Sequence, residues 1–331
     1  MNKELKKKIF DLMIKSRVLE ERLIKMNKAG MGFFWLGGPG EEAFNVPLGL
    51  LIRKGSGLDY DYLHFHYRQS ATMLAMGEEM IGSIRQMHNT ITDPYSGGRN
   101  FVGHFSKKEW NVVPGSSAIE VQHLAAIGTA EAQRRNKSKG ITIVTGGDAG
   151  TAEGDFASCL VWASRQKKLL PILIIVTNNN WGISTPYCEV HNKQPIAKRG
   201  DGFGIKNAVV NGNDVEASYK AIQNAMDYVR NKRQPFLLEA RVSRLYGHSS
   251  ASGANRANEE DCIPKFEKKL LKEKIIQKGT ASEIFEKYDK ESRGALQETL
   301  GEPKPRPESI FDHVFAERES AMEPTPRWFK R

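Results

Sequence analysis

One stretch of the chain, residues 141–186, constrains the fold more than any other. It begins with a short β-branched apolar run that stops at two glycines and Asp148, and it continues through a segment with the composition of a helix. A second apolar run, residues 172–176, leads directly to three asparagines at 178–180. Strand, helix and strand joined by short turns predict two parallel strands, because such a crossover returns the chain in the same direction.

The two polar turns are predicted to lie at the carboxyl edge of the sheet, where open α/β sheets bind their ligands. Asp148 and Asn179 then face each other across a small gap. A carboxylate, an amide oxygen and a backbone carbonyl are oxygen ligands that suit Mg²⁺, and a helix start beside them favours a diphosphate. An ordinary βαβ unit with a polar loop is the alternative. No GK[ST] or GxGxxG spacing is present at the strand end, which argues against a P-loop and a dinucleotide site.

Composition narrows the class of protein. No apolar run approaches the roughly 20 residues of a membrane span. Three widely spaced cysteines without CxxC indicate reduced thiols and no structural zinc. The net charge of +10 permits nucleic-acid binding, but no aromatic-basic module supports it, so solvated faces and an acidic protein partner are favoured. The basic N-terminus lacks a signal-peptide apolar segment, so we expect a cytoplasmic protein, with a mature organelle form as the alternative.

The order GD, helix, strand, NN resembles the thiamine-diphosphate motif. With its surroundings it resembles the alpha subunit of the decarboxylating component of 2-oxo acid dehydrogenase complexes, from about residue 5 to about residue 260. The resemblance implies thiamine diphosphate and Mg²⁺, with Asp148, Asn179 and the carbonyl of Trp181 as metal ligands. It also places Ala149 and Gly150 against the cofactor. Ala149 stands where the motif has glycine, which is acceptable only if the backbone there needs no positive φ.

Further cofactor contacts follow from the resemblance. In the segment DYDYLHFHYR, Tyr67 and Arg68 match the pair that holds the diphosphate. The chemistry agrees, because a phenol donates one hydrogen bond and a guanidinium binds phosphate in a forked geometry. In the segment SSAIEVQ, Ser117 and Ile119 match the positions that present a serine and a backbone group to the cofactor. Thr177 replaces a basic residue often found before the two asparagines, which leaves Arg68 as the clearest side-chain cation.

Nearby residues bind potassium in some members of the family. Ser116 and Gln122 match that pattern, but Val121 lacks the hydroxyl, which leaves potassium open.

Histidines supply the candidate catalytic residues. His248, in the segment RLYGHSS, matches a histidine that reaches the cofactor from a mobile loop. A pKa near neutrality suits it to donate a proton or to stabilise an oxyanion. His104, in the Gly-rich segment GGRNFVGH, matches a position in the active-site approach loop, with a solvated loop histidine as the alternative. His64 and His66 have metal-like spacing but no third ligand, and we expect them in the site lining or at the surface.

The fold class expected is α/β, a thiamine-diphosphate-binding fold with a mostly parallel central sheet, helices on both faces, and helical extensions at both ends. Helical spacing predicts further helices at residues 71–88, 116–135 and 214–233, with a helix that starts near Thr151. The expected parts are a helical arm with an aromatic loop at 1–55, the cofactor-binding domain at 56–262, and a charged helical extension with a tail at 263–331.

The resemblance implies oxidative decarboxylation of a 2-oxo acid, with transfer of the acyl group to lipoyl-lysine of an acyltransferase. The glutamate that activates the pyrimidine has no matched position here. In the family it comes from a beta subunit, so we expect an α₂β₂ assembly. The segments GGRNFVGH, SSAIEVQ and NNNWGISTP favour a branched-chain substrate, with a pyruvate or acetoin enzyme as the first alternative.

Two other classes of protein stay open. One is a transketolase-like half enzyme, against which the YGHSS and aromatic loops argue. The other is a non-catalytic binding protein that keeps the fold, and Ala149 and Thr177 are the features that favour it.

Overall fold

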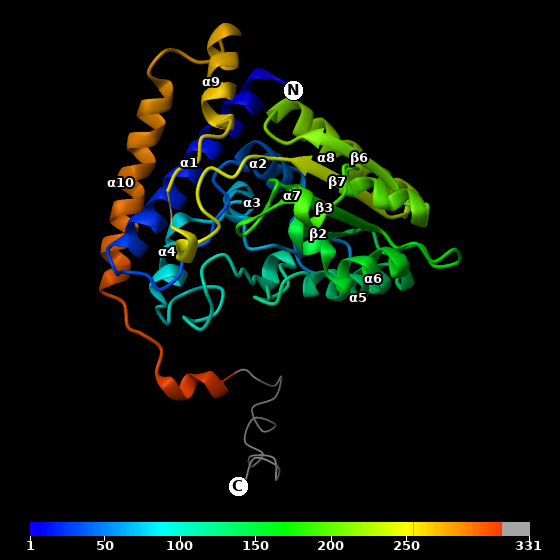
Figure 1. The fold of residues 1–331 in the computed structure, drawn as a ribbon. Coiled ribbons are helices and arrows are strands. Elements are labelled where there is room, and N and C mark those ends of the chain that lie inside the picture. The colour runs from blue at the N-terminus through cyan, green and yellow to red at the C-terminus, as the bar shows by residue number, and fades with distance from the viewer. Residues whose placement is uncertain (254, 313–331) are drawn as a thin grey trace.

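The computed structural model describes residues 1–253 and 255–312, and its centre is a five-stranded sheet (Figure 1). The strands lie in the order β1-β2-β3-β7-β6, and every neighbouring pair is parallel. Their bounds are Tyr62–His64, Thr142–Gly147, Ile172–Asn178, Phe236–Arg241 and Lys206–Asn211, in that order. A small antiparallel ribbon of β4 (Trp181–Gly182) and β5 (Thr185–Pro186) follows β3. The prediction of an α/β fold with a parallel sheet is confirmed.

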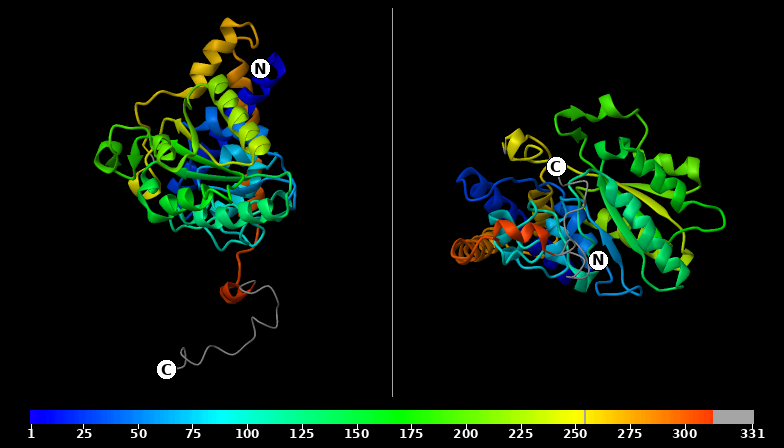
Figure 2. Two further views of the ribbon diagram at one scale, coloured as in Figure 1. Left: turned by 90° about the vertical axis from the view of Figure 1, so that its right-hand side faces the viewer. Right: turned by 90° about the horizontal axis from the view of Figure 1, so that it is seen from below.

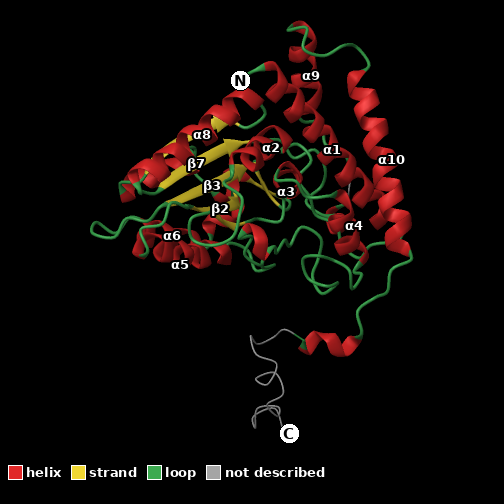
Figure 3. Ribbon diagram, turned by 180° about the vertical axis from the view of Figure 1, so that it is seen from behind, coloured by secondary structure: helices red, strands yellow, loops and turns green. Residues whose placement is uncertain are grey.

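Helices cover both faces of the sheet (Figure 3). One face, with Ile143 and Ile175, packs against α2 (Glu42–Leu51), α3 (Ser70–Ala75) and α8 (Val215–Lys232). The other face, with Val144 and Ile174, packs against α5 (Val121–Arg135) and α6 (Gly154–Ala163). Because both faces of β3 are buried, its sequence is a continuous apolar run rather than an alternating one.

A layer of helices lies beside the sheet (Figures 1 and 2). It consists of α1 (Lys3–Lys28), α4 (Met80–His88), α9 (Cys262–Lys272) and α10 (Thr280–Leu300). One apolar cluster joins Phe10 of α1, Phe266 of α9 and Leu296 of α10. The buried Arg17 pairs with Glu42 at 2.7 Å and with Asp261 at 2.8 Å. The two expected extensions therefore pack together as one layer.

Short helices complete the described chain: η1 (Lys108–Trp110), η2 (Ala149–Ala152), α7 (Tyr187–Val190), η3 (Ile196–Phe203), η4 (Ser250–Ser252) and η5 (Pro307–Phe311). Across the described ranges, every helix is too short or too polar to traverse a bilayer. Of the expected tail, residues 313–331 lie outside the described residues.

Three expected helices have different boundaries. Residues 71–88 form two helices, α3 and α4, because Gly77 adopts φ of 106° between them. The helix expected from residue 116 begins at Val121, since Glu120 has a left-handed φ of 66°. After Asp148 a 3₁₀ turn precedes α6, so that Glu153 rather than Thr151 occupies the N-cap position. The helix expected at 214–233 forms α8, which Asp214 caps by accepting a hydrogen bond from the amide of Ala217.

The buried His64 of β1 gives the folded chain a specific dependence on pH. Its Nε2 lies 2.9 Å from Thr129 Oγ1, and burial lowers its pKa to about 3. In the unfolded chain His64 is protonated as the pH falls through about 6.5, whereas in the folded chain it stays neutral down to a much lower pH. The stability that His64 contributes is therefore present above pH 6.5 and is lost as the pH falls toward the folded pKa.

We expect His64→Gln, which keeps a hydrogen-bonding side chain without a titrating ring, to flatten this dependence. Between pH 7 and pH 5 the wild type should lose roughly 2 kcal/mol more free energy of unfolding than the variant. Urea denaturation at the two pH values measures the difference. Equal losses in the two proteins would show that His64 is not held neutral.

Candidate active site

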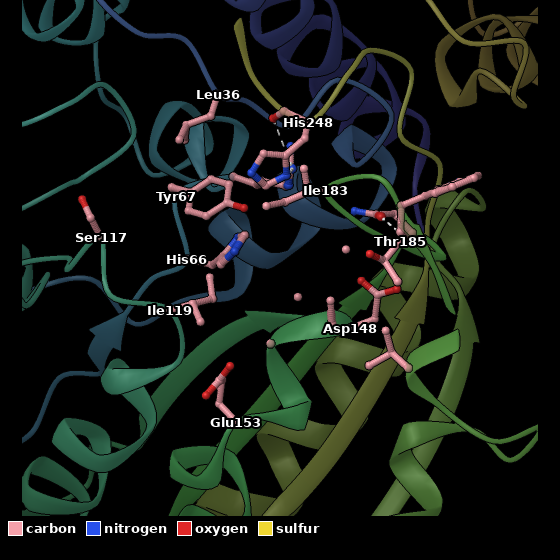
Figure 4. Close-up of a pocket in the computed structure, with 18 of the residues that line it drawn as sticks. Leu36, His66, Tyr67, Ser117, Ile119, Asp148, Glu153, Ile183, Thr185 and His248 are labelled. Carbon is pink, nitrogen blue, oxygen red and sulfur yellow. Dashed lines mark hydrogen bonds between the residues drawn. The ribbon is translucent and has the colours of Figure 1, made fainter. Parts of the chain in front are cut away.

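A cavity of about 510 Å³ lies at the carboxyl ends of β1, β2, β3 and β7, and its size is typical of a small-molecule site (Figure 4). Its walls come from segments far apart in the sequence. The eleven residues that the sequence predicts for the site all line it: Tyr67, Arg68, His104, Ser117, Ile119, Asp148, Ala149, Gly150, Asn179, Trp181 and His248. The residues predicted for the site therefore gather at this edge of the sheet, and their role in binding a ligand stays a prediction. His66 lines the same cavity, whereas His64 lies in the core.

Asp148 is the strongest candidate for a metal ligand. It follows β2 directly and is 2% exposed, and in the part of the chain that the structure describes its Oδ2 has no hydrogen-bond partner. Burial raises its pKa to about 6. A desolvated carboxylate without a partner is costly, and a bound cation removes that cost. Asn179, directly after β3, accepts the amide hydrogen of Trp181 at 3.2 Å and keeps a second lone pair on Oδ1. These oxygen donors fit Mg²⁺.

A hydrogen-bond network supports the Asp148 turn from behind. The carbonyl of Asp148 accepts hydrogen bonds from Thr151 Oγ1 at 2.7 Å and from His191 Nε2 at 2.9 Å. Arg199 donates to His191 Nδ1 at 2.9 Å and to the carbonyl of Thr151 at 2.7 Å. Sequence reasoning missed the roles of His191 and Arg199, because their contacts with the Asp148 turn form only in the folded chain. Such supporting groups keep ligands oriented.

The alanine at the third motif position is accommodated by a glycine elsewhere. Ala149 lies in the 3₁₀ turn η2 and does not have a positive φ. Its methyl group packs against Gly182 of β4, where an added Cβ would lie 2.5 Å from the Cβ of Ala149. The condition under which alanine is acceptable is therefore met. Gly182 leaves the space that the methyl group needs.

If the cavity binds thiamine diphosphate as the resemblance implies, we expect Gly182→Ala to weaken that binding by roughly tenfold, since overpacking of this kind costs about 1–3 kcal/mol. The new methyl group must displace the β4 turn, which carries Trp181, or η2, which follows Asp148. Adding Ala149→Gly to the same chain should restore the affinity, because it removes the opposing methyl group. Titration with thiamine diphosphate at fixed Mg²⁺ measures both variants. Wild-type affinity in Gly182→Ala, or no recovery in the double variant, would contradict this packing argument.

Arg68 is a buried cation held between three loops. Its Nη1 donates to the carbonyl of Gly37, its Nη2 lies 3.2 Å from His248 Nδ1, and its Nε lies 3.9 Å from Glu41 Oε1. The rings of Tyr67 and His248 lie 6.0 Å apart, edge to face, and Figure 4 shows them across the cavity from Asp148. The guanidinium is thus fixed at the cavity wall with donors to spare for an anion.

The contact with Arg68 determines the tautomer of His248. Burial and the neighbouring guanidinium groups of Arg68 and Arg244 lower the pKa of His248 to about 4, so the imidazole is neutral near pH 7. A guanidinium can only donate, so Nδ1 accepts and the proton is on Nε2. His248 therefore offers the cavity an N–H donor rather than a base.

His104 makes hydrogen bonds through both ring nitrogens. Its Nδ1 lies 3.1 Å from the carbonyl oxygen of Phe101, which can only accept, so Nδ1 carries the proton. Its Nε2 then accepts from the hydroxyl of Ser117 at 2.9 Å. Burial lowers its pKa, which keeps the ring neutral. In this arrangement His104 orients Ser117, and it has no free proton to transfer.

Comparison with known proteins identifies the family. The chain matches the model of the dehydrogenase E1 component over residues 10–309. The chain belongs to the dehydrogenase E1 component family. It is 30% identical to the 2-oxoisovalerate dehydrogenase subunit alpha of Bacillus subtilis (strain 168) over 317 residues, which cover 93% of this chain and 94% of the relative. The mitochondrial 2-oxoisovalerate dehydrogenase subunits alpha of Mus musculus and Homo sapiens are each 28% identical. The matches cover 94% of this chain and 71% and 70% of those relatives.

The structure of this E1 component adds a second cation that sequence reasoning did not single out. The guanidinium of Arg244 lies 5.7 Å from the centroid of the Trp181 ring, and within the described residues its buried Nη1 has no hydrogen-bond partner. Burial and the charge of Arg68 lower its pKa. Arg244 lies three residues beyond β7, so the rule that predicted Asp148 after β2 would also have found it.

One wall of the cavity in this E1 component is apolar. The aromatic rings of Phe34 and Phe101 lie 5.3 Å apart and form this wall, and Leu36, Ile183 and Val190 add further apolar surface to the cavity lining. The sequence predicted the aromatic loop but not the contact of Phe34 with Phe101, which only the fold brings together.

Proposed function

We propose that the chain is the alpha subunit of a thiamine-diphosphate- and Mg²⁺-dependent 2-oxo acid dehydrogenase that acts on a branched-chain substrate. The observation that carries the proposal is the convergence of the predicted ligands on one cavity at the carboxyl edge of the sheet. The relatives named 2-oxoisovalerate dehydrogenase support the choice of substrate.

The cavity offers complementary groups for each part of the cofactor. Asp148, Asn179 and the carbonyl of Trp181 would hold Mg²⁺ at the diphosphate. Tyr67 and Arg68 would bind the diphosphate, with Arg244 supplying the second positive charge that Thr177 cannot. Ser117 and Ile119 would face the pyrimidine, and Ala149 and Gly150 would lie against the cofactor next to the metal. Bound thiamine diphosphate supplies the electron sink that decarboxylation of a 2-oxo acid requires.

His248 would act on the substrate oxygen. As a neutral donor fixed by Arg68, it can hydrogen-bond the keto oxygen as negative charge develops there. His104 would act through Ser117, whose hydroxyl it orients. The two candidate catalytic histidines thus have different roles, one toward the reacting atoms and one as a positioning residue.

The apolar wall supports a branched aliphatic substrate. Phe34, Leu36 and Phe101 present a surface that the methyl group of pyruvate would leave mostly uncovered. Each additional methylene buried on such a surface contributes about 1–3 kcal/mol to discrimination.

A partner subunit would complete the site. Of the described residues that line the cavity, Asp148 and Glu153 are the acids, and Glu153 is an exposed N-cap of α6. The glutamate that activates the pyrimidine would therefore come from a beta subunit in an α₂β₂ assembly. The cavity is open on one side, where Ile119 is 41% and Ile183 is 58% exposed. The acyl group would then pass to lipoyl-lysine of an acyltransferase.

A lipoyl-acceptor assay of the chain with its partner subunit tests the proposal. With Mg²⁺ and thiamine diphosphate present, we expect kcat/KM for 2-oxoisovalerate to exceed that for pyruvate by about tenfold or more. A preference for pyruvate would overturn the substrate assignment. Failure of the assembled protein to bind thiamine diphosphate would overturn the proposed function itself.

A further inference from the structure

A buried carboxylate under the active-site wall has no role in the site as described so far. Glu120 is fully buried and has a left-handed φ of 66°, and within the described residues neither of its carboxylate oxygens makes a hydrogen bond that meets ordinary geometry. The equally buried His123 places Nδ1 2.7 Å from Glu120 Oε2. Both the backbone conformation and the desolvated charge cost free energy, and such costs concentrate at functional sites.

The Glu120 side chain connects the two cofactor-binding turns. Its backbone directly follows Ile119 in the turn that is expected to face the pyrimidine. Its carboxylate packs under the Asp148 turn, where a Cβ added to Gly150 would lie 2.1 Å from Oε1 and one added to Gly146 would lie 2.7 Å from Oε2. Neither glycine has a positive φ, so both are required here by the space that Glu120 occupies.

The residues that resemble a potassium site do not converge on a place for an ion. Val121 is 37% exposed on the outside of α5. Ser116 is exposed, and its hydroxyl accepts the amide hydrogen of Ala118 at 3.1 Å. The amide nitrogen of Gln122 donates to the carbonyl of Thr145 at 3.1 Å. The interior between this turn and β2 is filled instead by the side chains of Glu120 and His123. Potassium therefore does not fit this turn.

We infer that the Glu120–His123 pair is a built-in positioning pair that replaces a potassium ion. The pair packs between the turn of Ser117 and Ile119 and the turn of Asp148. It thereby fixes the distance between these two parts of the cavity wall. The inference rests on the proposed function, because it assigns the pair to the binding of thiamine diphosphate and Mg²⁺. The pair touches neither group and acts through the turns.

The first test compares monovalent cations in the wild-type assembly. Thiamine diphosphate is titrated at fixed Mg²⁺ in KCl, in NaCl and in tetramethylammonium chloride, and the change in tryptophan fluorescence measures binding. Because the three salts screen charges equally at equal ionic strength, we expect the dissociation constants to agree within about threefold. A larger preference for potassium overturns the inference and leaves the proposed function standing, since the cofactor has then bound.

The second test uses shape-conserving variants. Glu120→Gln keeps the packing against Gly146 and Gly150 but removes the charge, and we expect it to raise the dissociation constant about tenfold. His123→Gln should raise the dissociation constant by a similar factor. In the double variant the dissociation constant should rise about tenfold rather than about a hundredfold, because the two changes remove the same single interaction. Potassium should restore none of these losses.

Two results of the variant series overturn the inference. Wild-type affinity in Glu120→Gln would show that the side chain only fills space, and multiplied losses in the double variant would show that the two residues act separately. Far-UV circular dichroism checks that each variant folds. If a single variant does not fold, the inference is tested by the double variant together with the salt comparison in the wild type. The double variant leaves no unpaired buried charge.

Discussion

Replacing Asp148 with asparagine is expected to weaken Mg²⁺-dependent binding of thiamine diphosphate by about 100-fold or more. The carboxylate is 2% exposed at the end of β2, and its Oδ2 has no partner in the described part of the chain. An amide of the same shape cannot supply the negative charge that, in the proposed function, would hold Mg²⁺ at the diphosphate. Calorimetric titration of the cofactor into the assembled protein, with and without Mg²⁺, measures the loss.

The same variant should be more stable than the wild type when no cofactor is present. A desolvated, unpartnered carboxylate costs the folded chain roughly 1–3 kcal/mol, and asparagine removes the charge. If the variant loses cofactor binding and also has a higher thermal midpoint of unfolding, the Asp148 carboxylate serves function at the expense of stability. Asp155→Asn, in the first turn of α6 and outside the cavity lining, is the matched control, and it should leave cofactor affinity unchanged. Retained Mg²⁺ dependence in Asp148→Asn would remove this residue from the metal site.

Replacing His248 with alanine is expected to lower kcat by about 10²- to 10⁴-fold while cofactor affinity changes little. The side chain supplies an Nε2–H donor whose tautomer is fixed by the 3.2 Å contact of Nδ1 with Arg68. Alanine removes the donor from the position where negative charge develops, but it leaves the Asp148 and Arg68 side chains in place. Steady-state rates with 2-oxoisovalerate and a lipoyl acceptor, combined with cofactor titration, separate catalysis from binding.

A neighbouring serine provides the control for His248. Ser252→Ala changes an exposed side chain of the same loop and should leave kcat unchanged. A His248→Ala variant that loses cofactor affinity in proportion to its rate would assign the residue to binding instead. A variant with the wild-type rate would leave the proposed donor without a role.

The structure explains one of the two features that favoured a non-catalytic protein, and the proposed function explains the other. The methyl group of Ala149 is accommodated by Gly182. The cation missing at Thr177 would be supplied by Arg244, whose guanidinium lies 5.7 Å from the ring of the cavity residue Trp181. Neither compensation is visible in local sequence, since Gly182 is 33 positions beyond Ala149 and Arg244 is 67 positions beyond Thr177. Only the contact of Gly182 with Ala149 in the folded chain shows that the alanine is compensated.

Some predicted helix boundaries were wrong because the spacing of apolar residues carries no information about backbone conformation. A left-handed Glu120 starts α5 five residues late, and Gly77 divides one expected helix into α3 and α4. The helical arm expected at the N-terminus forms α1, but its packing partners α9 and α10 come from the other end of the chain. Helical spacing reports that a face is apolar and does not report what covers it.

The sequence by itself determined the parallel sheet and the edge at which Asp148 and Asn179 meet, because chain direction, crossover handedness and side-chain type are local properties. A resemblance, matched residue by residue, also predicted site residues that the fold brings into one cavity. The tertiary structure alone decided which nitrogen of His248 carries the proton, why Ala149 is tolerated, and that Glu120 and His123 lie beneath the Asp148 turn. These properties depend on contacts between residues distant in sequence or on a single backbone angle, and neither follows from the order of residues along the chain.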